Sequence, residues 1–176
     1  MKKPLLAAAL ALATVSSHSQ HSGYAGQQQR DIKALSAEEV SQYLSGAGMG
    51  YAKAAELNGF PGPMHALELS DRLGLSDTQR AATRRLMDEH KADARRIGFK
   101  LVEAEAAVEE LFRRGDVDPA VLAQSVRNAA ALQGEYRLAH LETHRRMRAL
   151  LSEEQVKRYD ALRGYSSPGT AHPHRH

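Results

Sequence analysis

Apolar and small residues recur at every third or fourth position from residue 76 to residue 114, and no proline interrupts the run. The positions that carry this pattern are Leu86, Ala94, Ile97, Leu101, Ala104, Val108 and Leu111. Such spacing is typical of one amphipathic α-helix, which Gly115 would end. The pattern predicts a helix of about 39 residues that is ~58 Å long, because each residue adds ~1.5 Å.

A second run with the same spacing follows Asp118 and continues to about residue 150. Asp118 can cap a helix, and Pro119 suits its first position because no amide is needed there. A short turn between two long helices implies that they lie antiparallel. If the turn centres near residues 116–117, facing positions add up to about 233, which places His90 opposite Thr143. The sequence therefore predicts an all-α fold built on a long antiparallel helical hairpin.

A Leu-Ser-x-x-Gln motif occurs twice, at residues 75–79 and 151–155. In this motif the serine hydroxyl accepts from the amide of the third helical residue, and the glutamine side chain returns to the serine amide. Both copies therefore predict helix starts, the second for a terminal helix from residue 153 to 162. The register of the hairpin brings the two motifs together at its open end.

Short helices are expected before the hairpin. Ser36 and Glu39 form a third capping box, which predicts a helix through about residue 44. Two more short helices are expected at residues 51–57 and 64–73, separated by glycines and prolines. Inside the long helices, Gly98 and Gly134 each cost about 1 kcal/mol against alanine, so we expect another backbone to approach closely at both.

The first 19 residues have the layout of a cleaved secretory signal. Lys2 and Lys3 precede an apolar stretch over residues 5–15, and three serines follow. The stretch is shorter than the ~20 residues that span a bilayer, so we expect export to the periplasm without stable membrane insertion.

Charge and composition exclude several classes of function. The chain has 24 Lys and Arg residues against 21 Asp and Glu residues, and loss of Lys2 and Lys3 with the signal leaves a mature chain close to neutral. A nucleic-acid partner is therefore not indicated. The chain has no cysteine, and neither a Ser-His-Asp order nor a phosphate-binding glycine loop is found. We expect no enzymatic activity.

Histidines on both long helices form the first candidate site. His140 and His144 are four residues apart and share a helix face, with Met147 one turn further on. His90 approaches from the partner helix. Imidazole suits zinc, nickel, cobalt or copper(II), whereas the thioether of Met147 would favour copper(I).

A second pair, His65 and Glu68, lies on the short helix before the hairpin, which can fold back toward residues 85–90. The alternative is that all these histidines are ordinary residues of the helix seam with no ligand. The tail, residues 166–176, is expected to be disordered, and its His172, His174 and His176 would bind metal only weakly because an unfolded segment loses entropy on chelation.

Arginines near the open end of the hairpin form a candidate surface for a protein partner. Arginine suits this role because its stem covers apolar area while its head pairs with carboxylates. The alternative is a solvated helix face balanced by glutamates. The residues are Arg84, Arg85, Arg145, Arg146 and Arg148.

The paired Leu-Ser-x-x-Gln motifs resemble the Leu-Thr-x-x-Gln signature of the periplasmic Spy/CpxP family, whose relatives include the metal-responsive ZraP and CnrX. Serine in place of threonine preserves the capping chemistry. The resemblance covers residues 63–165, preceded by a flexible lead with short helices at residues 20–62. It implies a cradle-like homodimer that binds unfolded clients or a sensor-kinase or anti-sigma partner.

The resemblance also implies a role in the response to envelope stress or metal. We therefore expect a non-enzymatic periplasmic protein that binds a transition metal ion, unfolded proteins, or both. The alternative is a chaperone independent of ATP, or a regulatory partner of a sensor kinase, with no metal site.

Overall fold

The computed structural model describes residues 23–115 and 117–166, and within them all regular structure is helical. The expected signal sequence and nearly all of the histidine-rich tail lie outside the described residues. The elements are a short 3-10 helix at Gln27–Gln29, α1 (Ala37–Ser45), α2 (Lys53–Glu56), α3 (Pro63–Glu68), α4 (Ser70–Leu73), α5 (Asp77–Arg114), α6 (Pro119–Leu150) and α7 (Glu153–Arg163). Among the described helices, none is long and apolar enough to cross a membrane.

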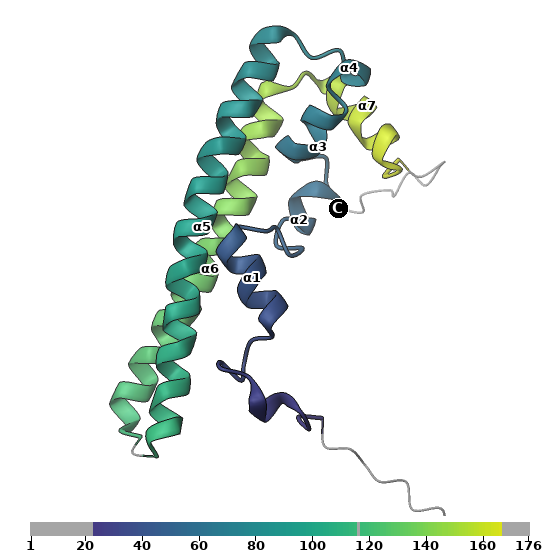
Figure 1. The fold of residues 1–176 in the computed structure, drawn as a ribbon. Coiled ribbons are helices and arrows are strands. Elements are labelled where there is room, and N and C mark those ends of the chain that lie inside the picture. The colour runs from purple at the N-terminus through teal and green to yellow at the C-terminus, as the bar shows by residue number, and fades with distance from the viewer. Residues whose placement is uncertain (1–22, 116, 167–176) are drawn as a thin grey trace, which may run out of the picture.

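Helices α5 and α6 form the predicted antiparallel hairpin, and the shorter helices lie along one side of it and at its open end (Figure 1). Helix α5 is 38 residues long and ends at Gly115, which has a φ of 75°. Asp118 caps α6 as expected, because its carboxylate accepts from the amides of Ala120 and Val121. The predicted register is confirmed by the contact between His90 Nδ1 and Thr143 Oγ1, at 3.0 Å.

All three predicted capping boxes are present, at Ser36, Ser76 and Ser152. The two Leu-Ser-x-x-Gln motifs also meet at the open end. Gln79 donates its side-chain amide to Gln155 at 2.8 Å and receives the amide of Gln155 at 3.1 Å. The motif therefore starts two helices and joins them to each other.

Replacing Ser152 with alanine should lower the free energy of unfolding by about 1 kcal/mol, because the amide of Gln155 loses the hydroxyl that it donates to at 3.2 Å. Urea unfolding followed by circular dichroism measures the change. Ser41 provides a control, since it is exposed in the middle of α1. Equal stabilities for Ser152→Ala and Ser41→Ala would contradict a stabilising role for this cap.

Two apolar cores hold the short helices against the hairpin. The first lies at the open end and contains Leu73, Leu86, Met147 and Tyr159, among others. The second lies under α1 and contains Tyr43, Ala94, Ile97, Leu101 and Tyr136. The segment expected as a lead at residues 20–62 thus contains two helices that pack on the hairpin.

Helix α1 approaches the hairpin closely at only one of the two glycines that lie inside the long helices. At Gly98, a Cβ would lie 2.1 Å from the carbonyl oxygen of Tyr43 on α1. The expectation of a close backbone approach is confirmed there. It is wrong for Gly134, where a Cβ would meet nothing within 4 Å.

Candidate functional site

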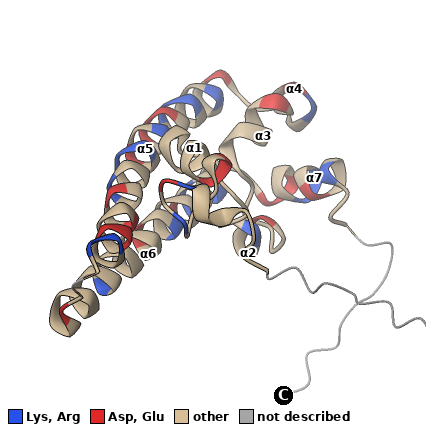
Figure 2. Ribbon diagram, turned by 60° about the horizontal axis from the view of Figure 1, so that its bottom comes forward, with Lys and Arg blue, Asp and Glu red and all other residues tan. Residues whose placement is uncertain are grey.

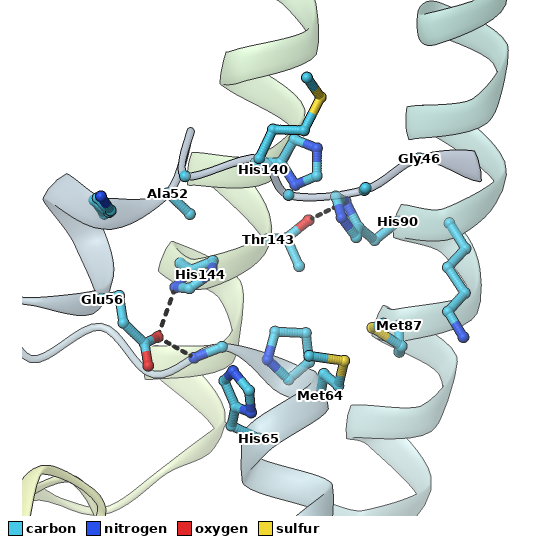
Figure 3. Close-up of a pocket in the computed structure, with 18 of the residues that line it drawn as sticks. Gly46, Ala52, Glu56, Met64, His65, Met87, His90, His140, Thr143 and His144 are labelled. Atoms are coloured by element: carbon cyan, nitrogen blue, oxygen red, sulfur yellow. Dashed lines mark hydrogen bonds and ion pairs between the residues drawn. The ribbon is translucent and has the colours of Figure 1, made fainter. Parts of the chain in front are cut away.

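A pocket of about 520 Å³ lies where the hairpin meets α2 and α3 (Figure 3). All four histidines of the described residues line it: His65 from α3, His90 from α5, and His140 and His144 from α6. Residues 45–50, at the end of α1 and after it, close another side. We call this feature the histidine pocket.

The hydrogen bonds of His90 determine which of its ring nitrogens carries the proton. Nδ1 lies 3.0 Å from the hydroxyl of Thr143, and that hydroxyl donates its single proton to the carbonyl of Ala139 at 2.8 Å. With the hydroxyl proton on the nearer acceptor, the carbonyl of Ala139, Nδ1 of His90 is the donor to Thr143. The neutral ring keeps its lone pair on Nε2, which is the nitrogen that a ligand can use.

His144 is held in the same way by the backbone. Its Nδ1 lies 2.8 Å from the carbonyl oxygen of Phe60, which can only accept, so Nδ1 is again the donor. The ring packs against Gly62, where a Cβ would lie 3.0 Å from Cε1 and 3.2 Å from Nε2. A glycine at this position leaves room for the ring.

The carboxylate of Glu68 orients His65 across one turn of α3. His65 Nδ1 lies 2.9 Å from Glu68 Oε2, which makes Nδ1 a donor and leaves Nε2 with the lone pair. Glu68 itself is exposed and does not line the histidine pocket. The two side chains pair as their spacing predicts, and of the two only His65 lines the pocket.

His140 is the most buried histidine, with only 4% of its surface exposed. Its ring centroid lies 4.5 Å from that of His90 and 4.8 Å from that of Tyr136. Its Nε2 is buried and has no hydrogen-bond partner among the described residues. A buried polar atom without a partner costs free energy, so this nitrogen can gain a partner without losing one.

Burial changes the protonation of the two central rings. Burial, together with the nearby rings of His90 and His144, lowers the pKa of His140 to about 4. Burial also lowers the pKa of His90, with a smaller contribution from His144. At neutral pH both rings are therefore uncharged, which is the form that binds metal ions.

Glu56, which no sequence pattern singles out, accepts several hydrogen bonds at the edge of the pocket. Its Oε1 accepts from the hydroxyls of Tyr159 at 2.6 Å and Tyr165 at 3.1 Å, and its Oε2 accepts from the amide of Gly62 at 3.0 Å. The same Oε2 lies 3.5 Å from Nδ1 of His144. Glu56 therefore connects α2, the segments after α2 and after α7, helix α7 itself and the pocket.

The sequence profile of a protein family described as heavy-metal resistance matches residues 40–158. This segment is more than half of the 176 residues and contains both long helices and all four pocket histidines. The chain belongs to the heavy-metal resistance family. Comparisons with curated proteins and with solved structures gave no match.

In this member of the heavy-metal resistance family, Met147 is separated from the predicted histidines. Its side chain is fully buried in the core at the open end, together with Leu73, Leu86 and Tyr159. The structure therefore does not bring Met147 together with the histidines that the sequence grouped with it. Three other methionines, Met49, Met64 and Met87, line the pocket instead.

The nitrogen and sulfur atoms that could bind a metal ion in this heavy-metal resistance protein line one pocket, but they do not surround a single point. Among the described residues, no group of three or more His, Cys, Asp and Glu side chains is placed so that it could hold a metal ion. The donors nevertheless suit a late transition metal, because imidazole nitrogen and thioether sulfur are both ligands of such ions.

Acidic neighbours accompany most of the arginines expected to bind a partner. Figure 2 shows basic and acidic residues interleaved along α5 and α6. The pairs are Arg145 with Glu142 at 2.6 Å, Arg146 with Glu89 at 2.7 Å, and Arg148 with Glu153. Arg84 and Arg85 are exposed and make no ion pair with any described residue. Of the five arginines, only these two lack an ion pair among the described residues.

Proposed function

We propose that this heavy-metal resistance protein is an exported, non-enzymatic protein of the Spy/CpxP type that binds a transition metal ion in the histidine pocket. The observation that carries the proposal is the orientation of three rings. His65, His90 and His144 each donate from Nδ1 to a neighbour in the protein, which leaves the lone pair of Nε2 free.

This arrangement is the one that metal-binding histidines usually have. Such residues donate their second ring N–H to a carboxylate, a backbone carbonyl or another fixed group, which sets the tautomer and the direction of the ring. Here the three acceptors are Glu68, Thr143 and the carbonyl of Phe60. Histidines without a ligand would have no reason to share one pocket. They would also have no reason to be fixed in one tautomer by hydrogen bonds.

His140 would supply a fourth nitrogen, because its buried Nε2 has no partner among the described residues. Binding would require movement of side chains within the pocket, since the rings do not yet surround one point.

The proposal is tested by metal titration of the full chain carrying alanine at His172, His174 and His176, which removes competition from the tail. Zinc, nickel, cobalt, copper in both oxidation states and silver(I) are each titrated by competition with a chelator. At a free concentration 100 times the dissociation constant, the bound ion should stabilise the fold by about 2.7 kcal/mol.

In the same background, His144→Ala should weaken binding by more than about 100-fold, because even the loss of a supporting hydrogen bond costs about 10–100-fold. The matched control is Glu68→Gln, which keeps an acceptor for His65 and should retain most of the affinity. Circular dichroism checks that both variants fold. If no ion binds at micromolar concentration, the metal-binding proposal is rejected.

A second function, binding of unfolded proteins, has support from the surface of the hairpin. Phe99, Phe112 and Leu138 are each more than half exposed, and Arg84 and Arg85 are also exposed. Apolar and cationic groups together suit an unfolded client. A chain that binds no metal but suppresses aggregation of a denatured model protein would favour this function instead.

A further inference from the structure

Methionine is concentrated at the histidine pocket. Of the four methionines in the described residues, Met49, Met64 and Met87 line it, and only Met147 does not. They come from three separate parts of the chain: the segment after α1, helix α3 and helix α5. Figure 3 shows Met64 and Met87 beside the histidines, facing each other from neighbouring helices.

Met49 has a backbone conformation that glycine adopts more easily. Met49 has a φ of 46° and is the only residue other than glycine with a positive φ in the described part of the chain. This conformation is costly for a residue with a Cβ, and residues held in such strained conformations cluster at active sites and ligand clamps. The side chain also packs against the core under α1, so it links the pocket to that core.

The charges around the pocket disfavour an ion with a high charge. Its single carboxylate, Glu56, already accepts from Tyr159, Tyr165 and Gly62. The other charged side chains in the lining are cationic: Lys53, Lys91 and Arg163. The free-energy cost of removing an ion from water rises with the square of its charge. A monovalent ion therefore loses much less hydration free energy than a divalent ion when it enters this pocket.

The remaining donors are neutral nitrogen and sulfur atoms. Thioether sulfur is a soft ligand that selects copper(I) over zinc, nickel and cobalt, and silver(I) shares this chemistry. The buried Nε2 of His140, which has no partner among the described residues, adds a neutral donor at the same place.

Building on the proposed function, we infer that the histidine pocket is a site for a soft monovalent ion, copper(I) or silver(I), held by imidazole nitrogen and by the thioethers of Met64 and Met87. Met49 would cover the ion from the segment after α1. The lining groups that set this preference are the methionines, whereas the histidines would serve soft and borderline ions alike.

The test uses the full chain with the three tail histidines replaced by alanine. Silver(I) in a chloride-free buffer, copper(I) under reducing and oxygen-free conditions, and zinc(II) are titrated in parallel. The wild-type pocket should bind silver(I) and copper(I) more tightly than zinc(II). The ε-methyl NMR signals of Met64 and Met87 should shift with silver(I), while that of Met147 should not.

The double variant Met64→Leu, Met87→Leu should weaken silver(I) and copper(I) binding on the order of tenfold or more, because soft ligands are lost, and leave zinc(II) binding nearly unchanged. Met147→Leu is the matched control, since it makes the same change in the core, where such exchanges are tolerated.

The outcomes separate this inference from the proposed function. Tighter binding of zinc(II) than of both monovalent ions, or silver(I) affinity unchanged in the double variant, would overturn the soft-ion inference and leave metal binding intact. Binding of no ion would overturn both.

Discussion

Replacing Gly98 with alanine should destabilise the protein by at least about 1–3 kcal/mol and loosen α1 from the hairpin, the cost expected for an overpacked interior. The new Cβ would lie 2.1 Å from the carbonyl oxygen and 2.8 Å from the carbonyl carbon of Tyr43, and 3.2 Å from Cε2 of Tyr136. Two of these are backbone atoms, which cannot rotate away. Urea unfolding measures the loss, and hydrogen exchange of the α1 amides shows whether the helix has separated.

The other internal glycine provides a control of opposite sign. At Gly134 a Cβ would meet nothing within 4 Å, so Gly134→Ala should stabilise α6 by up to about 1 kcal/mol through helix propensity alone. Equal effects of the two substitutions would show that α1 does not approach α5 as closely as the structure indicates.

The metal-free protein should lose stability as the pH falls from about 6.5 toward 4. In the unfolded chain a histidine titrates near 6.5, whereas burial lowers the pKa of folded His140 to about 4. Between these two pH values His140 binds a proton in the unfolded state but not in the folded state. The contribution of His140 to stability is therefore complete above pH 6.5 and is lost as the pH falls toward 4. The loss from His140 should be on the order of 2 kcal/mol after allowance for solvent screening, and His90, whose pKa is also lowered, adds to it.

Chemical denaturation at a series of pH values tests this dependence. His140→Gln, which cannot be protonated, should flatten the curve between pH 6.5 and 4.5. Carboxylates with lowered pKa values, such as Glu39, lose their contribution only below about 4.5. The raised pKa values of Glu105 and Asp160 act in the opposite direction, because their contribution is lost as the pH rises. An unchanged slope in the His140 variant would assign the dependence to other groups.

Local patterns predict the hairpin well because its helices are long and capped at identifiable residues. The three serines at the N-caps and the proline at the start of α6 mark boundaries that the structure places within one or two residues. The contacts of glycine are less predictable. Gly98 and Gly134 have the same sequence signal, but only the packing of α1 decides which of them another backbone approaches.

The candidate site was predictable where it depends on the hairpin register. That register placed His90 close to Thr143, and spacing placed His140 and His144 on one face. Met147 continues the same face, but one turn further along α6 this face is covered by the core at the open end.

The groups contributed by short segments carry no periodic signal. Glu56 belongs to a helix of only four residues, and Met49 lies between two glycines outside any helix. One signal was available, because Met87 and His90 are three residues apart and therefore share a face of α5.

The amide pair at the open end of the hairpin has a consequence for how the molecule opens. Each glutamine side-chain oxygen accepts from the amide of its own capping serine and from the side chain of the other glutamine. When one of these helix ends frays, its own capping hydrogen bonds break. The glutamine of the other cap then also loses its hydrogen bonds to the glutamine of the frayed end. The glutamines of the two caps are 76 positions apart in the sequence. The first turns of α5 and α7 should therefore open together, as one cooperative unit.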